Sequence, residues 1–150
     1  MIIGSLLLCL GMLTGCGEKR PDGMPKTYPC ELTLTQGGKP LVKAQVMLYP
    51  KDAPCPWTVG GSTDENGVAE INTHGKYKGA PNGDWVVTVS KNIIIYKDEN
   101  DDTGDVYSKV ELDYMNRDTT PLELKTDGKT KAALDVGEEV EIYLEDVNDR

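Results

Sequence analysis

The stretch that decides the fold of this chain is Trp85-Val86-Val87-Thr88-Val89-Ser90. It consists of aromatic and β-branched residues, which fit the half-buried surface of a pleated sheet. Side chains alternate between the two faces of a strand, so Trp85, Val87 and Val89 share one face. We expect that face to be core, and the stretch to form the best-defined strand of the chain.

Similar but weaker patterns recur on both sides of this stretch. Cys30, Leu32 and Leu34 alternate with polar residues, which is typical of a half-buried strand. Further short strands are expected within the ranges 44–50, 57–59, 68–72, 93–96, 122–124 and 140–144, whereas 107–117 fits either a strand or a short helical segment. Seven or so short strands, with a turn about every 8–15 residues, predict an all-β sandwich.

The N-terminus has the features of an export signal. Its apolar run, within residues 2–13, is shorter than the roughly 20 residues needed to cross a bilayer, and it has the length of a signal-peptide core. The run ends in Leu13-Thr14-Gly15-Cys16, which resembles a bacterial lipobox: an apolar residue, two small residues and a cysteine. We therefore expect cleavage before Cys16 and acylation of its thiol, with an ordinary signal peptide as the alternative. The first basic residue is Lys19, so the usual basic start of a signal is missing.

Composition divides the remainder into a linker and one domain. Residues 16–29 are rich in glycine, proline and charge, as in a flexible linker, and residues 30–147 are long enough for a single domain. The net charge of −9 argues against nucleic-acid binding, which needs a basic surface. We expect contact with the membrane through the lipid, and a location in the cell envelope facing the periplasm or the exterior. The residue after the lipidated cysteine is Gly17 and not the aspartate that retains some lipoproteins in the inner membrane, so the outer membrane is slightly favoured.

Two cysteines remain once the signal is removed and Cys16 is acylated. Cys30 and Cys55 form an even pair in an oxidising compartment, which favours a disulfide. Closing this loop would contribute roughly 3–4 kcal/mol in the chain-entropy model. Two free buried thiols are the alternative. A zinc site lacks ligands, because the chain has a single histidine, His74, at no recognisable spacing from the cysteines.

Three segments resemble carboxypeptidase-regulatory-like domains. These are Gly38-Lys39-Pro40-Leu41 followed by Ala44-Gln45-Val46, then Thr63-Asp64-Glu65-Asn66-Gly67, and then Gly79-Ala80-Pro81-Asn82-Gly83-Asp84-Trp85. Asp64 is expected to close an Asx turn that Gly67 completes in a left-handed conformation. The resemblance implies a transthyretin-like, immunoglobulin-like sandwich of about seven strands. It also implies a non-catalytic accessory or interaction module, although a fold analogy alone does not establish function.

The residues offer little sign of catalysis. His74 lies in no nucleophile or metalloprotease motif, and a surface histidine is the simpler interpretation. The acidic loop begins like an EF-hand, at Asp98, Asn100 and Asp102, but has Thr103 where the glycine belongs and Lys109 where the final glutamate belongs. A looser calcium site remains an alternative to a solvated charge run; its ligands would be Asp98, Asp101, Asp102 and Asp105.

The sequence thus predicts a lipid-anchored, non-catalytic envelope sandwich with a structural or protein-interaction role and no cofactor. A carbohydrate- or calcium-binding module is the alternative. The carbohydrate version needs an exposed stacking platform, for which Trp57, Tyr77 and Trp85 are candidates. The C-terminal strand carries Glu138, Glu139, Glu141 and Glu145, which predicts a charged edge that resists pairing with another sheet.

Overall fold

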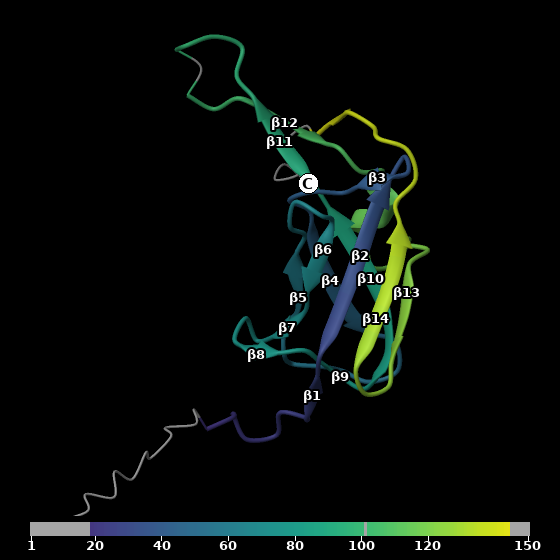
Figure 1. Cartoon of the computed structure of the whole chain (residues 1–150). Helices are drawn as coiled ribbons and strands as arrows, with labels where there is room; N and C mark the ends of the chain where they lie inside the picture. Colours follow the sequence, from purple (N-terminus) through teal and green to yellow (C-terminus); the bar gives the residue numbers. More distant parts are fainter. Residues whose placement is uncertain (1–18, 101, 145–150) are drawn as a thin grey trace, which may run out of the picture.

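Two β-sheets pack face to face in the computed structural model, which describes residues 19–100 and 102–144 (Figure 1). The larger sheet has the order β13 (Glu123–Thr126), β10 (Gly83–Ser90), β4 (Gln45–Pro50), β5 (Val59–Ser62), β7 (Asn72–Thr73) and β8 (Tyr77–Lys78). The smaller sheet has the order β14 (Thr130–Asp135), β2 (Cys30–Gln36) and β3 (Lys39–Pro40), and β6 (Val68–Glu70) also pairs with β2. The predicted all-β sandwich is confirmed.

The stretch from Trp85 to Ser90 forms most of β10, the strand between β4 and β13. In the antiparallel register, Val87 lies opposite Leu48 and Val89 opposite Val46. All four valine and leucine side chains are buried, and Trp85 is only 3% exposed. The predicted core face of this strand is therefore confirmed.

The structure contains more and shorter strands than the sequence predicts. The predicted strand 68–72 is divided at Ile71, where the chain crosses from the smaller sheet (β6) to the larger one (β7). The predicted strand at 57–59 lies later, because β5 begins only at Val59. The undecided range 107–117 contains the end of β12 (Asp105–Ser108) and the four-residue helix α1 (Leu112–Met115). No helix within residues 19–100 and 102–144 is long and apolar enough to cross a membrane.

Strand β14 is absent from the sequence-based expectations, yet it completes the smaller sheet. It runs parallel to β2, with Leu134 opposite Leu34 and Ala132 opposite Leu32. Asp135 fixes its end, since its carboxylate accepts hydrogen bonds from Thr35 Oγ1 (2.7 Å) and the Gly137 amide (2.8 Å). These bonds stabilise the ionised form and lower the pKa of Asp135.

The folded part begins within the range predicted to be linker. Strand β1 (Thr27–Tyr28) pairs with β9 (Ala80–Pro81) at the lower end of the sandwich in Figure 1. Upstream, Arg20 donates a hydrogen bond to Thr27 Oγ1 (2.9 Å), and its guanidinium carbon lies 5.6 Å from the ring centre of Tyr77. The chain is therefore held against the domain from Arg20 onward. The predicted signal and Cys16 lie outside the described residues.

A three-stranded arm projects from the opposite end of the sandwich (Figure 1). It consists of β11 (Asn92–Ile95), β12 and β15 (Ile142–Tyr143), in the order β11-β12-β15. Strand β11 continues β10 after an interruption at Lys91, as the sequence predicts. Among the described strands β15 pairs with β12 alone, so the predicted position of the C-terminal strand at a sheet edge is confirmed.

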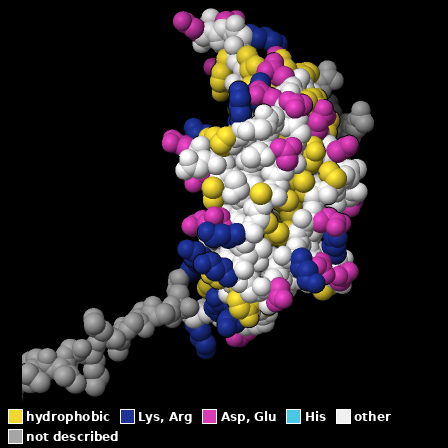
Figure 2. Space-filling model, turned by 45° about the vertical axis from the view of Figure 1, so that its right-hand side comes forward, with side chains coloured by type: hydrophobic (Ala, Val, Ile, Leu, Met, Phe, Trp, Pro, Cys, Tyr) yellow, Lys and Arg dark blue, Asp and Glu magenta, His cyan; other side chains and the backbone are white. Residues whose placement is uncertain are grey.

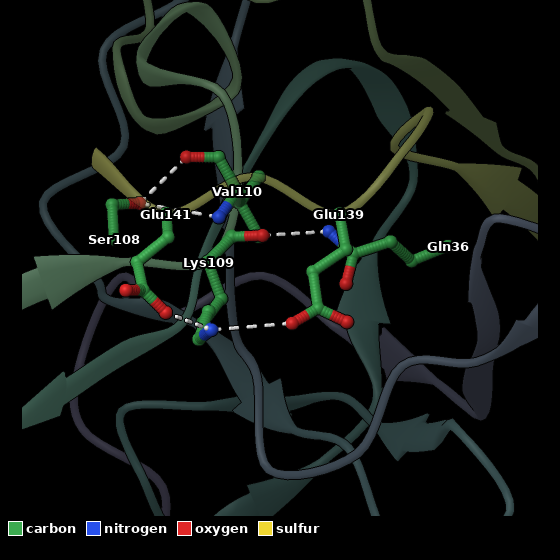
Figure 3. Close-up of polar contacts among 6 residues, drawn as sticks. All are labelled: Gln36, Ser108, Lys109, Val110, Glu139 and Glu141. Atoms are coloured by element: carbon green, nitrogen blue, oxygen red, sulfur yellow. Dashed lines mark hydrogen bonds and ion pairs between the residues drawn. The ribbon is translucent and has the colours of Figure 1, made fainter.

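Lys109 joins the arm to the sandwich at the point where β12 ends (Figure 3). Its ammonium contacts Glu141 at 2.6 Å and Glu139 at 3.3 Å, and its carbonyl accepts a 2.7 Å hydrogen bond from the side chain of Gln36 in β2. The hydrogen bonds to Glu141 and then Glu139 raise the pKa of Lys109. One residue thus connects β12, the segment before β15 and the smaller sheet: its side chain contacts the two glutamates, and its backbone carbonyl contacts Gln36.

Candidate ligand-binding groove

A concavity among the described residues lies at the lower end of the sandwich, where the N-terminal segment meets the domain. Its volume is about 430 Å³, within the range typical of small-ligand sites. The loop after β4 forms one wall with several prolines, and Pro25 and Pro81 contribute from the N-terminal segment and β9. Proline fixes its own backbone, so these walls are stiffer than an ordinary loop.

Two tryptophans line the groove in different ways. Trp57 is half-buried, and its ring meets His74 edge-on at 5.4 Å between centroids. Trp85 lies in the core and donates a hydrogen bond from Nε1 to Thr126 Oγ1 (2.9 Å), so only a small part of its surface reaches the groove. Tyr77 lies outside the groove beneath Arg20. The three aromatic residues therefore do not form a common platform, and of the two that line the groove Trp57 is the one with a partly open ring.

Polar groups at the rim of the groove come from the turn into β10 and from the loop after β4. Asp52 and Asp84 are both exposed there, and the Asn82 side chain accepts a hydrogen bond from the Gly128 amide (2.8 Å). An indole ring beside carboxylate and amide oxygens can stack on a flat apolar face and accept hydrogen bonds from hydroxyl groups. The sequence indicated Trp57 but not the two aspartates, because their shared position at the rim depends on the pairing of β4 with β10.

The two cysteines of the expected disulfide are free thiols in the structure. Cys30 begins β2 in the core, and burial raises the pKa of its thiol to about 11. Cys55 is half-buried in the groove wall, where its sulfur lies 3.4 Å from the Trp57 carbonyl oxygen as a weak donor. The structure therefore has two separate thiols in place of the expected disulfide, and of the two only Cys30 is buried, whereas the alternative was two buried thiols. Each sulfur has its own environment: one is in a strand of the core and the other is in a surface loop.

The acidic residues of the loop at the tip of the arm do not converge. The Asp98 carboxylate accepts a hydrogen bond from the Asn100 amide (2.8 Å), and Asp105 pairs with Lys97 (3.1 Å). Asp102 is exposed, and Asp101 lies outside the described residues. No three histidine, cysteine or acidic side chains gather as metal ligands within residues 19–100 and 102–144. The described part of this loop therefore gives the calcium alternative no support.

His74 has a structural role in the described fold. Its φ of 56° places it in the left-handed region, and its amide donates a hydrogen bond to the Thr58 carbonyl (2.6 Å). Its ring packs edge-on against Trp57. The residue therefore ties the β7–β8 turn to the loop that carries Trp57.

Comparison with known proteins does not assign the chain to a family. No known protein family matches the sequence, and no curated protein matches it. Among solved structures, a 9R-lipoxygenase from Cyanothece PCC8801 aligns with 80% of this chain at 19% identity and a TM-score of 0.34. The aligned part is 18% of the lipoxygenase chain. A likeness this low carries no argument about fold or activity, so the family resemblance of the sequence motifs stays a prediction.

Proposed function

We propose that this chain is a non-catalytic, lipid-anchored lipoprotein of the bacterial cell envelope that acts through binding. The observation that carries the proposal is the Leu13-Thr14-Gly15-Cys16 motif, placed only a few residues before the domain begins. Acylation of Cys16 would fix the lower end of the sandwich near a membrane. The arm at the opposite end would then point away from that membrane, toward other envelope components.

The arrangement of the described residues supports attachment close to a membrane. The chain is held to the domain from Arg20 onward, so only residues 17–19 would separate the lipid from the folded part. Four residue steps, from Cys16 to Arg20, would span at most about 14 Å. The domain would therefore stand close to the membrane surface. The acidic charge of −9 would not attract an anionic surface, so the lipid would supply the attachment.

The test is metabolic labelling of the full chain in bacterial cells with an alkyne analogue of palmitate, followed by mass spectrometry. The unchanged chain should take up label and give a mass that begins at Cys16 and includes acyl groups. Cys16→Ser should abolish labelling, whereas Cys55→Ser, the matched control, should leave it unchanged. Labelling that persists in Cys16→Ser, or an unlabelled mature chain that begins elsewhere, would contradict the anchor.

A carbohydrate-binding role is the second candidate, and the half-buried, partly open ring of Trp57 in the groove favours it. A single stacking ring predicts weak binding, because each aromatic contact contributes only on the order of 1 kcal/mol. Titration of the protein with chitohexaose and with maltohexaose, followed by tryptophan fluorescence, tests it. Quenching in the unchanged protein that Trp57→Ala removes would support this role. No quenching with either sugar, or quenching that survives in Trp57→Ala, would count against the groove as their site.

A further inference from the structure

The chain before β1 forms a strap, residues 20–26, at the lower end of the sandwich (Figure 1). A turn folds the strap back on itself: the Met24 amide donates a hydrogen bond to the Pro21 carbonyl (3.2 Å), and Gly23 has the φ of 82° that such a turn requires. Gly23 and Pro25 also line the groove, together with the loop after β4. The strap therefore supplies part of the groove wall.

One side chain, Arg20, fastens the strap to the domain. Its guanidinium donates hydrogen bonds to Thr27 Oγ1 (2.9 Å) and to the Pro25 carbonyl oxygen (3.4 Å). The guanidinium carbon also lies 5.6 Å from the ring centre of Tyr77, a cation–π contact. Because Thr27 lies in β1 and Tyr77 in β8, these contacts close the free end of the strap against two fixed elements. We refer to them as the Arg20 latch.

Burial adds little to the latch. Within the strap, Pro21 and Met24 are half-buried, and the other side chains are exposed. The first described strand, β1, begins only after the strap, so the strap is not part of a sheet. A segment with few buried residues and exposed hydrogen bonds opens locally at low free energy.

Basic side chains gather near the docked Arg20. Lys76 and Lys78 flank Tyr77 in the sequence, and Figure 2 shows Lys and Arg side chains close to the point where the N-terminal chain meets the sandwich. The hydroxyl, carbonyl and ring that Arg20 contacts carry no net charge, whereas like charges repel. The neighbouring lysines therefore weaken the latch rather than strengthen it.

Release of the strap would stop at β1, which is firmly held. Thr27 pairs with Pro81 and Tyr28 with Ala80 in β9. The backbone of Gly79 approaches Tyr28 so closely that a Cβ at Gly79 would clash with the Tyr28 carbonyl oxygen. The hinge of the strap therefore lies at the start of β1.

We propose that residues 20–26 are a strap with two positions, closed by the Arg20 latch and released. Release removes part of the groove wall and uncovers Trp57, a claim that depends on the described contacts alone. Release also lengthens the tether, and this half rests on the proposed acylation of Cys16. In the closed position four residue steps separate Cys16 from Arg20, at most about 14 Å; after release eleven steps separate Cys16 from Thr27, at most about 40 Å. The domain then stands either close to the membrane with the groove walled, or farther away with the groove open.

Limited proteolysis of the mature chain, purified in a mild detergent, tests the latch. Endoproteinase Asp-N cuts before Asp22, in the middle of the strap, and the rate of such a cut follows the population of the open form. Arg20→Ala should raise this rate about tenfold. Lys19→Ala is the matched control, because Lys19 is an exposed neighbouring cation outside the latch, and it should leave the rate unchanged. An unchanged rate in Arg20→Ala would overturn the proposal.

A pair of substitutions at Thr27 tests the latch far from the cut. Thr27→Val keeps the shape of the buried side chain but removes the acceptor of the 2.9 Å bond, so it should raise the rate as Arg20→Ala does. Thr27→Ser keeps the hydroxyl and should behave as the unchanged protein. If valine and serine act alike, the hydrogen bond does not hold the strap.

Acrylamide quenching of tryptophan fluorescence tests the opening of the groove. Trp85 is 3% exposed, so the quenching reports mainly on Trp57. Arg20→Ala and Thr27→Val should both increase the quenching constant, whereas Lys19→Ala should not. Faster proteolysis without increased quenching would show that the strap does not cover Trp57 and would overturn the groove half.

Energy transfer on phosphatidylethanolamine–phosphatidylglycerol vesicles that contain a rhodamine lipid tests the tether. The donor dye is attached to Leu112→Cys in a Cys55→Ser background, since Leu112 is exposed on α1, outside the strap and the groove. Transfer should be lower in Arg20→Ala than in Lys19→Ala, and equal transfer would overturn the tether half. A chain that does not stay on the vesicles would contradict the acyl anchor, and the tether half with it. The proteolysis and quenching results decide the strap in either case, because residues 20–26 are present with or without the lipid.

Discussion

The buried side chains of Trp85 and Thr126 form a short chain of hydrogen bonds that links strands β10, β13 and β9. The indole Nε1 donates to Thr126 Oγ1 (2.9 Å), and the Thr126 hydroxyl donates in turn to the Pro81 carbonyl (2.7 Å). Both side chains are buried, so no water can replace a lost partner. The three residues come from β10, β13 and β9, and the short chain of hydrogen bonds therefore holds three elements in place.

Trp85→Phe should destabilise the protein by about 2–3 kcal/mol, through the unpaired Thr126 hydroxyl and the space left by the smaller ring. Urea unfolding followed by circular dichroism measures this loss. Trp57→Phe is the control: the ring lies at the surface of the groove and is only half-buried, so the loss should stay below about 1 kcal/mol. Equal losses in the two variants would show that the buried hydrogen bond contributes little.

The two thiols should differ in reactivity. Cys30 is buried with a pKa near 11, whereas Cys55 is half-exposed in the groove wall. The thiolate is the reactive form, so at pH 8 a maleimide should label Cys55 in the native protein and Cys30 only after unfolding. Mass spectrometry of tryptic peptides identifies the labelled residue. Labelling of neither cysteine before reduction, and of both after it, would instead reveal a disulfide.

The raised pKa of Cys30 also predicts a loss of stability at alkaline pH. Between about pH 9 and pH 11 the unfolded chain releases the thiol proton while the folded chain keeps it. The folded state therefore binds more protons in this window, and the free energy of unfolding falls as pH rises. Cys30→Ala should remove this part of the pH dependence. Urea unfolding at pH 8 and pH 10.5, compared between the two proteins, measures the difference; identical slopes would contradict it.

At the scale of elements, the turn between β5 and β6 forms as the sequence predicts. The Asp64 side chain accepts hydrogen bonds from the amides of Asn66 (2.8 Å) and Val68 (2.9 Å). Gly67 has a φ of 75°, and a Cβ there would meet the Leu34 carbonyl oxygen at 2.6 Å. The glycine is needed for two reasons: the left-handed backbone and the close approach of β2.

A pair of glycine variants separates these two reasons. Gly38 has the same φ of 75°, but a Cβ added there would meet no atom within 4 Å. Gly38→Ala should therefore cost only about 1 kcal/mol, for the backbone conformation. Gly67→Ala should cost at least about 2–3 kcal/mol, because the turn must also move away from β2. Thermal unfolding measures both, and equal costs would show that β2 yields to the added methyl group.

At the scale of the whole molecule, Lys109 determines how firmly the arm is held. It is the meeting point of β12, the segment before β15 and the smaller sheet (Figure 3). The arm has few buried residues of its own, and a region of this kind opens locally at low free energy. The position of the arm therefore depends on this junction more than on packing within the arm.

Lys109→Ala should loosen the arm without unfolding the sandwich. Hydrogen exchange followed by mass spectrometry should show faster exchange in β11, β12 and β15, while β2, β4 and β10 stay protected. Lys131→Ala is the control, because its ion pair with Glu31 (3.7 Å) is exposed and surface pairs of this kind contribute little. Faster exchange throughout the sandwich would show that Lys109 supports the core rather than the arm.

The sequence by itself determined the sandwich class, the core face of β10 and the Asp64 turn. These features depend on contacts between residues near in sequence, where alternation and turn chemistry act directly. Tertiary structure alone decided the rest. Strand β14 has a weak strand pattern and exists through its parallel pairing with β2, more than ninety residues earlier. The same holds for the separation of Cys30 from Cys55, the scattering of the three aromatic residues, and the docking of Arg20 on Tyr77, because each depends on which distant segments the fold brings together.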